Sequence, residues 1–172
     1  MNMKMKFFLI PVVALALLAS LTAGRAKTPA PELKWYTDMS EANQVSEKTG
    51  KPLFAFFTGS DWCGWCMKLQ RDVFAKDAFK EWADKNVVLL ELDFPRRKQL
   101  TPELQQQNSN LQQAFQVTGY PTCWIFKAEK DPEKNHYTLS AYGSLGYPTG
   151  AEAGKEEVAF LANANQILNN KK

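Results

Sequence analysis

Two cysteines with two residues between them are the most reactive pattern in the sequence. The motif Trp62-Cys63-Gly64-Trp65-Cys66 follows an apolar run that ends at Phe57 and precedes a stretch with helical periodicity. Thiols at this spacing fit the first turn of a helix, where Cys63 would face unpaired backbone N–H groups and the positive end of the helix dipole. Both favour the thiolate over the thiol, so Cys63 is predicted to be a nucleophile.

Cys66 follows about one helical turn later. It shares an apolar helix face with Leu69 and Val73, so we expect it to be less accessible than Cys63. In this arrangement Cys63 attacks a disulfide, and Cys66 resolves the resulting mixed disulfide by thiol exchange.

The elements that must position these cysteines are predicted from periodicity, capping and turn signals. The almost wholly apolar run 53–57 is typical of a strand covered on both faces. Asp38 and Glu41 have the spacing of a capping box, and Gly50 and Pro52 supply stop signals for the helix that they begin. The predicted elements are a helix over 39–49, a strand over 53–57, a helix carrying both cysteines, a helical piece capped by Asp77, a strand over 87–92, a helix over 101–117, strands over 122–126 and 137–142 joined by a polar turn at 128–135, and a helix over 156–169.

The N-terminus is typical of a secretory signal peptide, residues 1–26. Lys4 and Lys6 precede an uncharged stretch whose strongly apolar part, 7–19, is shorter than the roughly 20 residues of a membrane span. We expect a linker over 27–32 and one domain over 33–172. The protein is therefore expected to be exported, periplasmic if its source is a Gram-negative bacterium, and membrane-tethered if the signal stays uncleaved.

Composition indicates a single globular domain. The 172 residues are 45% hydrophobic and 23% charged, which excludes wholesale disorder, collagen and a multi-span membrane protein. Without 1–26 the chain has 18 basic and 18 acidic residues, so it has no broad positive electrostatic field that would attract the phosphate backbone of a nucleic acid. The basic run 96–98 is interpreted as a solvated loop, and no nucleic-acid partner is expected.

Three other interpretations of the cysteine pair remain open. A purely structural disulfide would close a four-residue loop and contribute only about 2 kcal/mol. A zinc site needs four ligands, and only Cys123 and His136 remain, so no metal is expected. Two unpaired core cysteines are disfavoured by an oxidising exported setting. Cys123 is interpreted as a buried inert thiol, with a regulatory or transfer role as the alternative.

The motif at 62–66 after a strand, together with Gly119-Tyr120-Pro121-Thr122 before another strand, resembles the thioredoxin superfamily over Leu33 to Leu168. Residues 57–70 are similar to exported bacterial thioredoxin-like proteins of the thiol-disulfide interchange group. The resemblance implies a thioredoxin-like α/β fold, a three-layer sandwich with a central mixed β-sheet and helices on both faces.

The resemblance also implies roles for individual residues. Cys63 would be the attacking thiol, Cys66 the resolving thiol and Pro121 a cis-proline facing them. A cis X-Pro bond would expose the backbone of Tyr120 to an extended substrate. The expected substrate-binding residues are Trp62, Gly64, Trp65, Tyr120 and Pro121, with the three aromatic side chains forming an apolar rim that suits flexible polypeptides. The alternative for Trp62 is that it packs beneath the loop.

The sequence departs from the thioredoxin pattern in three places. Phe56 stands where a buried acid is usual, so Cys66 must pass its proton to water or to another carboxylate, of which Asp61 is the nearest in sequence. The dipeptide Gly64-Trp65 contains no histidine, so a middling to reducing potential is expected. The long connection from Asp93 to Pro121 adds a helix that could cover a face or carry specificity.

These observations predict an exported thiol-disulfide oxidoreductase without metal or organic cofactor. As a monomer it would exchange dithiol and disulfide with cysteine-containing polypeptides and with an unidentified redox partner, the reductase or isomerase direction being favoured. The alternative is a non-catalytic module of the same fold that binds or holds polypeptides.

Overall fold

A computed structural model describes residues 29–131, 133 and 136–170. The predicted signal peptide, 1–26, and the first two residues of the predicted linker lie outside the described residues. Among those described, no helix is long and apolar enough to cross a membrane.

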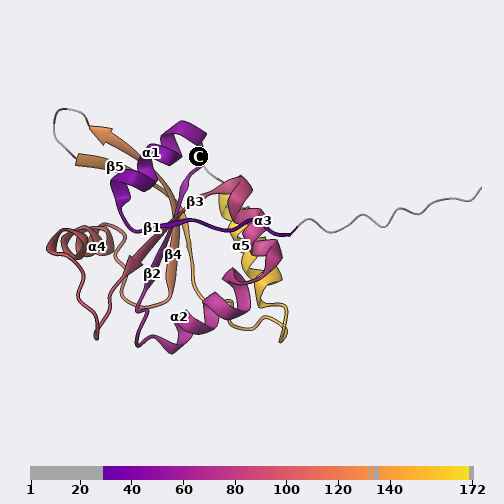
Figure 1. The fold of residues 1–172 in the computed structure, drawn as a ribbon. Helices are drawn as coiled ribbons and strands as arrows, with labels where there is room; N and C mark the ends of the chain where they lie inside the picture. The colour runs from indigo at the N-terminus through magenta and orange to yellow at the C-terminus, as the bar shows by residue number, and fades with distance from the viewer. Residues whose placement is uncertain (1–28, 132, 134–135, 171–172) are drawn as a thin grey trace, which may run out of the picture.

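The centre of the fold is a five-stranded mixed sheet with strand order β1-β3-β2-β4-β5 (Figure 1). β1 and β3 run parallel to β2, whereas β4 is antiparallel to β2 and forms a hairpin with β5. The elements are β1 (Trp35–Tyr36), α1 (Met39–Thr49), β2 (Leu53–Thr58), α2 (Gly64–Leu69), the π-helical turn η1 (Gln70–Phe74), α3 (Asp77–Asn86), β3 (Val88–Asp93), α4 (Pro102–Ala114), β4 (Thr122–Asp131), β5 (His136–Leu145) and α5 (Glu156–Asn169).

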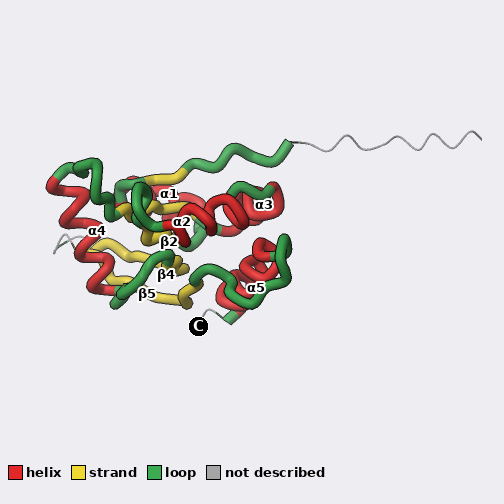
Figure 2. Tube along the Cα trace, turned by 90° about the horizontal axis from the view of Figure 1, so that it is seen from below, coloured by secondary structure: helices red, strands yellow, loops and turns green. Residues whose placement is uncertain are grey.

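Helices cover both faces of this sheet, which confirms the predicted fold class. α1 and α4 pack on one face, where Met39, Leu111 and Phe115 contact apolar side chains of β2 and β3. α2, η1, α3 and α5 pack on the other face. Figure 2 shows α4 on one side of the strands and α3 and α5 on the other.

Local signals fix the elements before the site. The side chain of Asp38 accepts a hydrogen bond from the Glu41 N–H at 2.9 Å, and Gly50 ends α1 with a φ of 72°, which favours glycine. Every residue of β2 is buried, as the apolar run predicts. β2 therefore delivers the chain to the cysteines from the middle of the core.

Three expectations about elements need correction, and one element was not expected. Asp77 is not a cap: Lys76 occupies the N-cap and Asp77 is the first helical residue, where a carboxylate still suits the helix dipole. α4 ends at Ala114 rather than 117, because Gln116 adopts a φ of 51°. The hairpin is longer than predicted, since residues 128–131 belong to β4 and not to the turn. The two-residue β1 at the sheet edge was not predicted.

Candidate functional site

The two cysteines form a disulfide at the start of a continuous helical segment, 64–74. Their Sγ atoms are 2.05 Å apart and their Cα atoms 5.2 Å apart. Cys63 is the N-cap of α2, and its Sγ accepts a hydrogen bond from the Cys66 N–H at 3.1 Å. Cys63 is 6% exposed and Cys66 fully buried, which confirms the predicted order of accessibility.

A tight turn around Gly59 brings Cys63 to this position. The Gly59 carbonyl accepts hydrogen bonds from the N–H groups of Trp62, at 3.2 Å, and Cys63, at 2.8 Å. The indole of Trp62 folds back over Gly59 so closely that a Cβ there would lie 2.3 Å from the Trp62 Cε2 atom. Only glycine permits this approach.

Trp62 joins the cysteine loop to two other segments. Its Nε1 donates a 2.7 Å hydrogen bond to the Phe94 carbonyl, and its ring meets Tyr120 edge-on with centroids 5.7 Å apart. The side chain is half-buried. Trp62 therefore packs against the loop, as the alternative interpretation had it, and also lies beside Tyr120.

The Tyr120–Pro121 peptide bond is cis, as predicted. The Tyr120 hydroxyl accepts a 2.7 Å hydrogen bond from the Gln112 side chain on α4, and its ring contacts Phe94 at a centroid distance of 5.3 Å. The helix added by the long connection therefore covers a sheet face and also positions Tyr120.

Trp65 lies apart from this group. It is 55% exposed, and its ring contacts Tyr147 at a centroid distance of 5.1 Å. The Tyr147 hydroxyl donates a 2.9 Å hydrogen bond to Asp72 and accepts one from the ammonium of Lys68. The aromatic groups thus form two ring pairs, Trp62 with Tyr120 and Trp65 with Tyr147. Gly64, between the cysteines, is exposed, with open space where a Cβ would lie.

Charged groups around Tyr147 are tightly paired. Hydrogen bonding from Arg71, followed by that from Tyr147, lowers the pKa of Asp72 to about 2. The same contacts raise the pKa of Lys68, mainly through its bond to Tyr147. This carboxylate and this ammonium therefore stay ionised at neutral pH.

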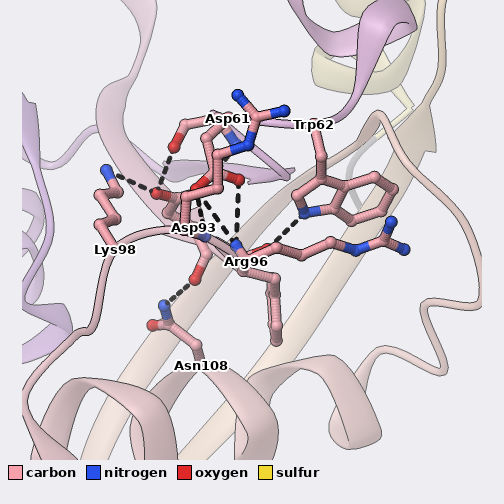
Figure 3. A network of polar contacts seen from close by, with 9 residues as sticks. Asp61, Trp62, Asp93, Arg96, Lys98 and Asn108 are labelled. Atoms are coloured by element: carbon pink, nitrogen blue, oxygen red, sulfur yellow. Dashed lines mark hydrogen bonds and ion pairs between the residues drawn. The ribbon is translucent and has the colours of Figure 1, made fainter.

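Asp61 anchors the loop that follows β3 (Figure 3). Its carboxylate accepts hydrogen bonds from the backbone N–H groups of Arg96, at 3.0 Å, and Arg97, at 2.7 Å. These bonds, that of Arg96 first, lower the pKa of Asp61. Both oxygens therefore accept backbone hydrogen bonds from the loop that follows β3.

Asp93, at the end of β3, makes hydrogen bonds and an ion pair to the segments on either side of it (Figure 3). Its carboxylate accepts hydrogen bonds from the Ser60 N–H at 2.8 Å and the Ser60 hydroxyl at 2.7 Å, and pairs with Lys98 at 2.8 Å. Asn108 on α4 donates a 2.9 Å hydrogen bond to the Asp93 carbonyl. The cysteine loop, the loop after β3 and α4 are thus joined through one residue.

A carboxylate that sequence reasoning missed lies next to Phe56. Phe56 is 1% exposed, and Glu91 is its register partner on β3. Glu91 is half-buried and borders an open pocket of about 520 Å³ together with Phe56 and Met67. Burial, and then the charge of Asp93, raise the pKa of Glu91. The signal for it was a single acid within the otherwise apolar run 87–92.

Cys123, the third cysteine, is fully buried in β4. Burial raises the pKa of its thiol well above the ordinary value, which agrees with the interpretation of an inert thiol. Within the described part of the chain, no three His, Cys, Asp or Glu side chains gather where they could hold a metal ion.

Comparison with known proteins places this architecture in a family. The sequence profile of a family described as thioredoxin-like matches residues 34–128, more than half of the chain. The chain belongs to the thioredoxin-like family. A solved structure of DsbH oxidoreductase superposes on this thioredoxin-like chain with a TM-score of 0.66 at 28% identity, covering 82% of this chain and 88% of that one.

Two curated relatives come from Chlamydia pneumoniae. The disulfide bond reductase DsbH is 37% identical over 100 residues, 58% of this chain and 60% of DsbH. The thioredoxin-related protein DsbJ is 30% identical over 134 residues, 78% of this chain and 36% of DsbJ. The chain therefore spans less than two thirds of either relative. A thioredoxin from Thermus thermophilus, at 15% identity and a TM-score of 0.55 over 80% of this chain and 88% of that one, shares the fold.

Proposed function

We propose that this protein is a thiol-disulfide oxidoreductase that reduces disulfides in polypeptide substrates through Cys63 and Cys66. The observation that carries the proposal is the disulfide itself, held at a helix start where the Cys66 N–H points at the Cys63 sulfur. A hydrogen bond and a helix N-terminus at this sulfur stabilise a thiolate, the form that attacks disulfides.

The reaction begins from the reduced pair. The Cys63 thiolate attacks one sulfur of a substrate disulfide, forming a mixed disulfide and releasing the other substrate sulfur as a thiolate, which takes up a proton. Cys66 then loses its proton and attacks the Cys63 sulfur, which forms the Cys63–Cys66 disulfide and releases the second substrate thiol. Two electrons pass from the protein to the substrate, and a dithiol redox partner returns them.

The surroundings of the disulfide suit a polypeptide. Trp65 and Met67, 55% and 50% exposed, lie beside it as uncovered apolar side chains. Trp62 contacts Tyr120, and the cis bond between Tyr120 and Pro121 supports the proposal that the Tyr120 backbone pairs with an extended segment of the substrate.

The proposed direction of electron transfer and the proposed compartment of the protein rest on further observations. Gly64 and Trp65 bring no histidine next to Cys63, and the relative DsbH is named a disulfide bond reductase, so the reducing direction is favoured. The signal-like residues 1–26 support an activity in an exported compartment, where substrates hold disulfides.

Insulin reduction by the mature chain in the presence of dithiothreitol tests the proposal. Cys63→Ser should abolish turnover above the rate of dithiothreitol alone. Cys66→Ser, prereduced and then mixed with insulin after dithiothreitol has been removed, should accumulate a mixed disulfide with insulin that runs as a covalent adduct on a non-reducing gel. Cys123→Ala is the matched control and should turn over at the wild-type rate.

Retained reduction by Cys63→Ser would overturn the assignment. A wild type without disulfide chemistry that suppresses aggregation as well as the double cysteine variant would instead establish the non-catalytic binding module.

A further inference from the structure

Two exposed arginines, Arg96 and Arg97, lie in the loop after β3 that packs beside Trp62, and they take no part in the exchange chemistry. The Asp61 carboxylate accepts hydrogen bonds from the backbone N–H groups of Arg96 and Arg97, and neither guanidinium group takes part in these bonds. The Arg96 guanidinium lies over the Trp62 ring, 3.9 Å from its centroid (Figure 3). Trp62 directly precedes Cys63, so a positive charge lies over the side chain next to the attacking cysteine in the sequence.

The charges around the site do not cancel locally. The chain segments 59–72 and 93–98, which carry the cysteines and the loop beside Trp62, hold five basic and three acidic residues, and segments 116–121 and 145–150 hold none. Each acid is already engaged: Asp61 by backbone N–H groups, Asp72 by Arg71 and Lys68, and Asp93 by Ser60 and Lys98.

Arg96 and Arg97 are the basic groups that remain available. Across the described ranges, no ion pair involves either of their guanidinium groups, and both residues are exposed. Arg96 also borders a hollow of about 380 Å³ between its loop and α4, lined in addition by polar side chains such as Gln105 and Ser109. An acidic side chain beside a substrate cysteine would find an unpaired guanidinium there.

We infer that the Arg96–Arg97 loop is a substrate-selecting surface that favours cysteine-containing polypeptide segments with acidic residues next to the cysteine. This inference rests on the proposed function and names the class of substrate for it. A guanidinium that lies over an indole keeps N–H groups free for a carboxylate, and the contact orders the side chain before the substrate arrives, so less side-chain entropy is lost on binding. The location on Trp62, the residue before the attacking cysteine, favours a polypeptide substrate over a lipid surface.

Single-turnover reduction of short cyclic peptides, each closed by one disulfide, tests the inference. The prereduced protein is mixed with a peptide whose cysteines are flanked by Glu or with one flanked by Lys, and the peptide dithiol is quantified after acid quenching. The protein dithiol supplies both electrons, so no other reductant is needed. Wild type should reduce the Glu peptide faster, and raising NaCl from about 20 mM to about 500 mM should shrink the difference.

The variant Arg96→Gln/Arg97→Gln should reduce the Glu peptide about threefold to tenfold more slowly, the range that exposed charge pairs give, and leave the Lys peptide unchanged or faster. The matched control, Lys85→Gln/Lys130→Gln, removes the same charge from exposed positions on α3 and at the far end of β4, and should behave as wild type.

Two outcomes would overturn the inference. Equal rates for the two peptides in wild type would show that charge does not select the substrate. Loss of binding to phosphatidylglycerol vesicles in the arginine variant, with unchanged peptide rates, would assign the loop to a lipid surface. Failure of the proposed function is distinguishable, since then neither peptide would be reduced by any variant.

Discussion

The contact between Gly59 and Trp62 allows a quantitative test of how the cysteine loop is built. Gly59→Ala would place a methyl group 2.3 Å from Cε2 and 2.5 Å from Nε1 of the indole, more than 1 Å inside ordinary contact. The ring must move, and the move breaks the 2.7 Å bond from Nε1 to the Phe94 carbonyl. Overpacking costs about 1–3 kcal/mol and the lost hydrogen bond about 1 kcal/mol, so we expect a destabilisation of roughly 2–4 kcal/mol.

Urea unfolding of the oxidised protein, followed by far-UV circular dichroism, measures this loss. A double-mutant cycle with Trp62→Phe isolates its cause, because the smaller ring vacates the atoms that the methyl group meets, and Gly59→Ala should then cost less than about 1 kcal/mol. Gly119→Ala is the matched control, since nothing lies within 4 Å of its Cβ position, and should change stability by less than about 0.5 kcal/mol. An equal cost of Gly59→Ala in both Trp62 backgrounds would refute the reasoning.

Three further predictions concern buried groups. Burial raises the pKa of Glu91 above its ordinary 4.5, so the folded protein loses stability as the pH rises through that folded-state pKa. Glu91→Gln should therefore stabilise the protein against urea at pH 8 but not below about pH 4. An equal effect of the substitution at both pH values would contradict this reasoning. In the reduced native protein, iodoacetamide should leave Cys123 unlabelled until urea is added, as read by mass spectrometry; labelling without urea would show an accessible thiol. Thr58 is fully buried with an unpartnered hydroxyl, so Thr58→Val should raise the free energy of unfolding by about 1 kcal/mol in a urea titration, whereas a loss would reveal a partner for that hydroxyl.

The sequence predicts elements well where the signal is local. α1 and α5 begin and end at the predicted residues, because a cap and stop signals mark α1 and an apolar period of about 3.6 residues marks α5. The hairpin is longer than predicted because Glu129 and Lys130 are exposed strand residues that carry the composition of a turn. β1 has only two residues and exists through its pairing with β3, which no local pattern reveals.

The same distinction applies to the site. The disulfide and the cis bond before Pro121 follow from short motifs, whereas the contacts of Tyr147 and Arg96 depend on segments far from the cysteines in sequence. Topology could have indicated both. β3 and β5 have their C-terminal ends on the same side of the sheet as the C-terminal end of β2. The residues that follow β3 and β5 must therefore lie near the cysteine loop.

The bonds that Asp61 and Asp93 make also bear on how such a motif can be transplanted. Copying the four residues from Cys63 to Cys66 into another protein of this fold would leave behind the glycine beneath the indole, the aspartates and the amide of Asn108 that fix its orientation. The structural unit that fixes the motif therefore comprises residues from three segments of the chain, and an engineer who wishes to transfer its reactivity must graft all three together.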